Sequence, residues 1–86
     1  MTSNINRTAK DIIAQTADRY GTKPSVILGR DIARVASVPR QAAMAAVQRN
    51  LGYSLPRIGR IFKRHHTTVL HGIRAHKARK AQETTT

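Results

Sequence analysis

The stretch Ser54-Leu-Pro-Arg-Ile-Gly-Arg-Ile-Phe-Lys-Arg-His-His-Thr-Thr-Val-Leu-His71 decides the fold of this chain. It predicts two short helices joined by a tight basic turn, which is the layout of a helix-turn-helix. Ser54 is placed to cap the first helix through its hydroxyl, and Pro56 is tolerated in the first turn because no intrahelical N–H is lost there. We expect Thr67 or Thr68 to cap the second helix.

The apolar residues of this stretch follow the same two-helix pattern. Ile58 and Phe62 are four residues apart and share one helix face, while Gly59 leaves room for the second helix to approach. Val69, Leu70 and Ile73 are then expected to lie inward on the second helix. This helix therefore begins with Arg, His and Thr side chains, which suit phosphate oxygens and base edges in a major groove. The stretch predicts binding to duplex DNA.

The composition of the chain is strongly basic, which favours a polyanionic partner such as DNA. The chain has 86 residues, enough for one small domain, and its 16 Lys and Arg against 4 Asp and Glu give a formal charge of +12. It has no Cys, which excludes disulfides and thiolate metal sites. The N-terminus lacks the apolar core of a signal peptide, and the longest apolar run, residues 42–47, is too short to cross a membrane. We expect a cytoplasmic, nucleoid-associated protein.

Start and stop signals organise the rest of the chain. Thr8 with Asp11 predicts a capped helix that ends at Gly21, and a short helix follows before residue 29. Pro39 is expected to open a helix that runs to Leu51. No strand pattern is found, so the fold class is all-α. We expect flexible tails at residues 1–7 and 80–86 around a DNA-binding domain at 8–79.

Three motifs resemble, in order and spacing, the C-terminal DNA-binding domain of the bacterial replication initiator DnaA. They are Pro39-Arg-Gln-Ala-Ala-Met44, Ser54-Leu-Pro-Arg-Ile-Gly59 and His66-Thr-Thr-Val-Leu-His71, and the resemblance extends from about residue 11 to residue 77. It implies a Trp-repressor-like helical domain that binds a short asymmetric box in duplex DNA. In that family the recognition helix enters the major groove and a basic loop reaches an adjacent minor groove.

The resemblance also implies which residues touch DNA. By position these are Arg40, Gln41, Leu55, Pro56, Arg64, His66, Thr67 and Thr68. Arg40 and Gln41 are expected at phosphates, and Leu55 and Pro56 close to the duplex. Thr methyl groups can pack on a thymine methyl, and an Arg side chain can fork onto guanine.

Three departures from the family pattern are evident. His65 stands where the family usually has Asp, and we include it in the site. The turn Lys63-Arg64 is one residue shorter than the usual Gly-Gly-Arg type. The minor-groove arginine aligns with Ile32, although Arg30 and Arg34 flank it; those two either enter a minor groove or neutralise phosphates. The recognised sequence is therefore expected to differ from the usual initiator box.

Catalysis and cofactors are not expected. The chain has no Gly-rich phosphate loop, and the ATPase domain of the family is missing, so ATP-driven origin opening is not expected. His66, His71 and His76 are five residues apart, which turns successive side chains by roughly 140° around a helix and prevents a shared metal ion. The acidic residues form no paired catalytic site.

Three functions remain, from two classes. The leading expectation is a sequence-specific binder of double-stranded DNA that regulates transcription, and the first alternative is occupation of replication-origin boxes. The other class is an RNA-binding or ribosomal structural protein, which is disfavoured because two Tyr and one Phe offer no base-stacking platform. The expected partners are duplex DNA and the transcription or replication machinery, and no membrane; the oligomeric state is left open.

Overall fold

The computed structural model describes residues 8–84, and these form helices without any strand. The helices are α1 (Ala9–Tyr20), α2 (Pro24–Ile27), α3 (Arg34–Leu51), α4 (Leu55–Phe62) and α5 (His66–Thr84). The all-α prediction is confirmed. Residues 80–84 continue α5, where the sequence suggested a flexible tail, and the expected tail at 1–7 lies outside the described residues.

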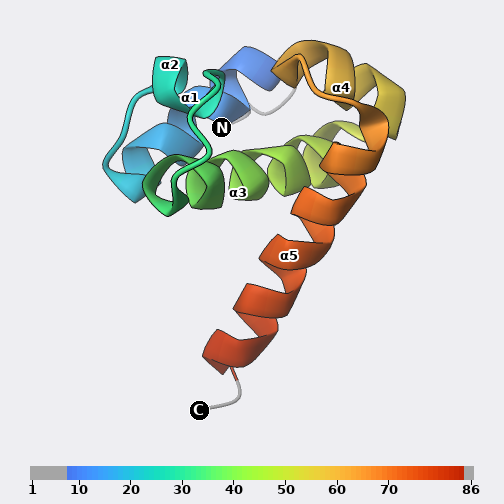
Figure 1. The fold of residues 1–86 in the computed structure, drawn as a ribbon. Coiled ribbons are helices and arrows are strands. Elements are labelled where there is room, and N and C mark those ends of the chain that lie inside the picture. The colour runs from blue at the N-terminus through green and yellow to red at the C-terminus, as the bar shows by residue number, and fades with distance from the viewer. Residues whose placement is uncertain (1–7, 85–86) are drawn as a thin grey trace, which may run out of the picture.

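Helix α3 is the centre of the fold, since it packs against each of the other four helices. Helix α5 packs across the middle of α3, where Gly72 lies against Gln41 and Met44, and its C-terminal half extends away from α4 (Figure 1). The core lies between α3 and its neighbours. Its members are Ile12, Ile13, Ala17, Ile27, Ala43, Met44, Ala45, Val47, Ile58, Phe62, Val69 and Ile73. Ile58, Phe62, Val69 and Ile73 are buried as the sequence predicted, and they pack the helix-turn-helix against α3. Leu70, which was also expected inward, is only half-buried.

Local capping signals define the ends of α1 and α4. The Thr8 and Asp11 side chains each accept a hydrogen bond from the other residue's backbone N–H, both at 3.2 Å, so the predicted capping box is present. Ser54 Oγ accepts from the Arg57 N–H at 3.3 Å and caps α4 as predicted. Gly21 ends α1 with φ +68°, a backbone conformation that Gly adopts without a Cβ clash.

The start of α3 was predicted wrongly. The helix begins at Arg34, and Pro39 lies inside it. Pro39 has no N–H to donate to the Val35 carbonyl, which normally disfavours an interior proline. Here Ala36, Pro39 and Arg40 are all buried on one face of the helix, and this packing outweighs the lost hydrogen bond.

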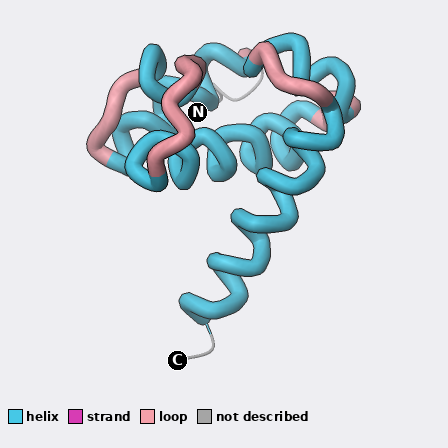
Figure 2. The backbone as a smooth tube through the Cα atoms, in the orientation of Figure 1, coloured by secondary structure: helices cyan, strands magenta, loops and turns pink. Residues whose placement is uncertain are grey.

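The turn between α4 and α5 is tight, and Figure 2 shows it as a short irregular segment between two helices. Lys63 ends α4 in the left-handed region, at φ +57°, and the Arg64 N–H donates to the Gly59 carbonyl at 2.8 Å. A Cβ atom on Gly59 would collide with the Arg64 carbonyl oxygen. The expectation that Gly59 serves packing is therefore confirmed.

Candidate nucleic-acid interface

Helix α5 begins at His66, and its cap is His65. The Thr67 N–H donates to His65 Nδ1 at 3.2 Å, and Thr67 Oγ1 lies 2.8 Å from the same nitrogen. The predicted caps, Thr67 and Thr68, lie instead within the first turn. Since Nδ1 accepts the backbone N–H, the neutral ring carries its proton on Nε2. His65 therefore keeps one outward donor.

The first turn of α5 presents polar groups to solvent. His65, His66, Thr67 and Thr68 are exposed, whereas Val69 is buried in the core. The free N–H groups at a helix start carry partial positive charge, and no acidic residue lies in this turn. This end of α5 is therefore suited to a negatively charged or acceptor-rich partner.

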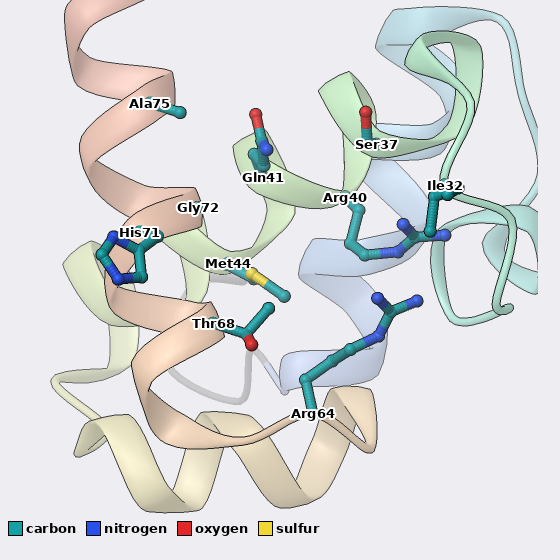
Figure 3. Close-up of a pocket in the computed structure, with 10 residues that line it drawn as sticks. All are labelled: Ile32, Ser37, Arg40, Gln41, Met44, Arg64, Thr68, His71, Gly72 and Ala75. Atoms are coloured by element: carbon teal, nitrogen blue, oxygen red, sulfur yellow. The ribbon is translucent and has the colours of Figure 1, made fainter.

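A hollow of about 310 Å³ lies between α3 and α5, and we call it the α3–α5 hollow. It brings together Arg40, Gln41, Arg64 and Thr68, which the sequence placed in the site, and Ile32 lies at its edge (Figure 3). Ser37 and His71 also line it, and sequence reasoning missed both. Both could have been predicted from helical spacing, because residues three or four apart share a face. Ser37 is four residues before Gln41, and His71 is three residues after Thr68.

Arg40 forms hydrogen bonds within the protein and also lines the α3–α5 hollow. Its side chain is 3 % exposed, so little of it can reach a phosphate. Arg40 Nε donates to the Ile27 carbonyl at 2.8 Å, and Nη2 donates to the Val26 and Gly29 carbonyls at 3.2 and 3.1 Å. Arg40 therefore holds the end of α2 against α3, and its contact with a phosphate stays a prediction.

Arg64 contacts the same segment but stays accessible. Its Nη2 donates to the Gly29 carbonyl at 2.7 Å, and the side chain is half-buried. Figure 3 shows the guanidinium groups of Arg40 and Arg64 near each other, beside Ile32. Burial lowers the pKa of Arg40, the positive charge of Arg64 lowers this pKa further, and Asp31 opposes both. Positive charge is thus concentrated beside the start of α5.

A second hollow, of about 500 Å³, lies where the loop before α3 faces the turn before α5. It is lined by Arg30, Lys63 and Arg64. The structure thus brings the predicted Arg30 beside residues 63–65, the turn before α5, which we call the recognition turn. Lys63 was missed as a site residue, although the basic turn sequence had pointed to it. Arg34 is not part of this group and lines a separate hollow with Tyr20.

The remaining predicted residues lie on α3 and α4. Gln41 is half-buried, and its Oε1 accepts from Arg79 Nη2 at 2.8 Å, which leaves the amide N–H groups as donors. Pro56 is exposed, whereas Leu55 is half-buried and packs against the core. Sequence reasoning missed the cation–π contact of Arg57, whose guanidinium lies 3.7 Å from the centre of the Tyr53 ring.

Residues 8–84 contain no group of three His, Cys, Asp or Glu side chains placed to hold a metal ion. Within the same range, no helix is both long enough and apolar enough to cross a membrane.

Comparison with known proteins identifies the relatives of this chain. Residues 9–75 match the family described as bacterial dnaA protein helix-turn-helix. The chain is 40 % identical over 72 residues to chromosomal replication initiator protein DnaA 1 of Chlamydia trachomatis, covering 84 % of this chain and 16 % of that protein. It is 43 % identical over 77 residues to the DnaA protein of Caulobacter vibrioides, covering 88 % and 16 %. The chain thus spans about one sixth of these relatives, and no solved structure matches.

Proposed function

Because this chain belongs to the bacterial DnaA helix-turn-helix family, we propose that it occupies short boxes in duplex DNA of the kind found at replication origins. The curated relatives are named chromosomal replication initiators, which favours the origin-box alternative over the transcriptional regulator that led the sequence analysis. DNA binding itself follows from family membership. Nucleoid association and contacts with the replication machinery belong to the proposal.

The exposed first turn of α5 is the observation that carries the proposal. Inserted in a major groove, it presents a His65 Nε2–H donor and the methyl groups of Thr67 and Thr68 to base edges. The Thr67 hydroxyl is held at His65 Nδ1, so its side chain is fixed before DNA arrives. A fixed side chain loses less conformational entropy on binding.

Phosphate contacts are assigned to the groups that flank this turn. Arg30, Lys63 and Arg64 line one hollow and offer positive charge beside the recognition helix. The amide N–H groups of Gln41 are the donors on the α3 side. Such contacts fix the position of the protein on the duplex, while base contacts supply the sequence preference.

Selection of bound sequences from a random duplex pool tests this function. One short asymmetric box should emerge, and footprinting across a bacterial genome with this chain should then protect a cluster of such boxes at the replication origin. Protection mainly at promoters would favour the regulator instead. Preference for structured RNA over the selected duplex at fixed salt would overturn DNA binding.

A further inference from the structure

A second basic surface lies away from the recognition turn, and we call it the basic cleft. Arg19 of α1, Arg49 of α3, and His76 and Lys80 of α5 line a hollow of about 130 Å³ between the three helices. No acidic side chain lines this hollow. The proposed box-binding site uses none of these residues.

The basic cleft and the α3–α5 hollow lie on opposite faces of α3. Ala42, Ala46 and Arg49 face the cleft, whereas Gln41 and Met44 face the hollow. At 100° per residue, the centres of the two sets are separated by roughly 140° around the helix. A duplex docked at the start of α5 therefore leaves the cleft uncovered.

The basic cleft is part of a longer groove. A neighbouring hollow of about 140 Å³ shares Arg19 and Arg49 with it and extends to Gln15 and Asn50. The groove thus runs along α1 and α3 instead of closing around one point. Two adjoining basic hollows suit the repeated phosphates of a polymer better than a single small anion does.

The positive charge in this groove is poorly compensated. Arg19 and Arg49 are exposed and form no ion pair with other residues in the described part of the chain. Lys80 Nζ lies 3.8 Å from Glu83 Oε1, but both side chains are mostly exposed, so this pair is weak.

His76 lines the cleft with a ring that has one unpaired nitrogen. Its Nδ1 is buried and has no hydrogen-bond partner within residues 8–84. Burial lowers the pKa of His76, the charges of Arg79, Lys80 and Arg49 lower it further, and Glu83 opposes them. A phosphate in the cleft would neutralise the surrounding cations and favour a protonated ring that donates to it.

We propose that the basic cleft binds the phosphate backbone of a second DNA duplex, so that one chain bridges two DNA segments. The bridge rests on the proposed function, since the first duplex is the box held at the start of α5. Arg19 and Arg49 supply forked donors that match phosphate oxygens. This contact has no base readout and is therefore independent of sequence and sensitive to salt.

A capture experiment tests the bridge. Beads carrying the selected box are loaded with the chain, box binding is measured, and a fluorescent duplex without a box is then added at low salt. Arg19→Gln combined with Arg49→Gln should retain box affinity but lower capture of the second duplex roughly tenfold. The control, Lys10→Gln with Lys77→Gln, removes the same charge from exposed positions outside the cleft and should capture the second duplex normally.

Failure of the bridge and failure of the proposed function are separate results. If no variant loads on the box beads, box binding has failed before the second duplex is added. If the cleft variant captures the second duplex as well as the control, the bridge is overturned. An equal loss of box affinity and capture in the cleft variant would also overturn it, because the cleft would then belong to the first interface.

The ring signals of His76 give a second readout by NMR. With the box already bound, the second duplex should shift these signals and raise the pKa of His76, since a phosphate stabilises the protonated ring. Inorganic phosphate alone is the comparison. A response to inorganic phosphate without any response to the second duplex would assign the cleft to a free anion and overturn the bridge.

Discussion

Arg40 and Arg64 donate to the same backbone oxygen, the Gly29 carbonyl, at 3.1 and 2.7 Å. Arg40 comes from the middle of α3, and Arg64 from the turn that precedes the recognition helix. Their shared acceptor ties this turn to the loop that carries Arg30. The loop to which we assign a phosphate contact and the helix to which we assign base contacts are thus held in one arrangement.

We expect Arg40→Met to destabilise the protein by about 2–3 kcal/mol, because the carbonyls at the end of α2 lose their buried donors. Urea unfolding followed by circular dichroism measures this loss. Arg34→Met, at an exposed position, is the control and should change stability by less than about 0.5 kcal/mol. Equal stability of the two variants would show that the buried hydrogen bonds of Arg40 do not stabilise the protein.

Thr67→Ala combined with Thr68→Ala should abolish sequence preference while the helix remains, because His65 still caps α5. Each lost base contact should remove about 1–3 kcal/mol of discrimination. Competition between the selected box and random DNA measures this change. The control is Ser25→Ala, an exposed hydroxyl on α2, and discrimination as strong as that of the control would contradict the assignment.

His65→Asp should change the base preferred at the start of the recognition helix. A carboxylate accepts the Thr67 N–H as the ring does, but it presents an acceptor outward where His65 presents Nε2–H. The preference should move from guanine acceptors toward the cytosine amino group, by about 1–3 kcal/mol. Binding to a set of boxes that differ at this base pair measures it. His65→Asn keeps an outward donor and should retain the original preference; an unchanged preference in the Asp variant contradicts the proposed donor.

Lys63→Gly should stabilise the protein by about 0.5–1 kcal/mol, because Lys63 ends α4 at φ +57° and glycine adopts this conformation without a Cβ clash. The same change should weaken DNA binding and make its salt dependence shallower by about one unit of slope. Lys63→Gln removes the charge but keeps the backbone strain. Lys63→Gln should weaken DNA binding as much as Lys63→Gly does, but it should not increase the stability measured by urea unfolding. Increased stability in both variants would exclude backbone strain as the cause.

Arg30→Ala and Arg34→Ala should now differ, since only Arg30 lies beside the recognition turn. Arg30→Ala should weaken binding to all boxes about equally and lower the salt slope by about one unit, as expected for a phosphate contact. Arg34→Ala should bind like the parent. If the loss in Arg30→Ala is confined to boxes with an A·T-rich flank, the residue contacts the minor groove instead.

Sequence reasoning succeeded where a structure depends on neighbours along the chain. The Thr8 capping box, the Ser54 cap and the terminal glycines act over a few residues, and the spacing of Ile58 and Phe62 revealed the buried face of α4. The family resemblance then located the recognition helix.

The errors concern contacts between distant segments. Pro39 has the local properties of a helix start, and only its packing reveals that α3 begins five residues earlier. Arg40 looks like a surface cation in sequence, because its acceptors lie 11 to 14 residues away. His65 is an unusual cap, and the common preference for Thr directed the prediction to the wrong residues.

Helix α5 runs without a break from the recognition turn to the basic cleft. At 1.5 Å per residue, Thr67 and Lys80 are separated by about 20 Å along its axis. In the bridge that we propose, α5 would set only the separation between the recognition turn and the α5 side of the cleft, because Arg19 and Arg49 of the cleft belong to α1 and α3. One residue inserted in this interval would turn His76 and Lys80 by about 100° relative to Arg19 and Arg49, so the cleft would lose its α5 side while the recognition turn stayed intact.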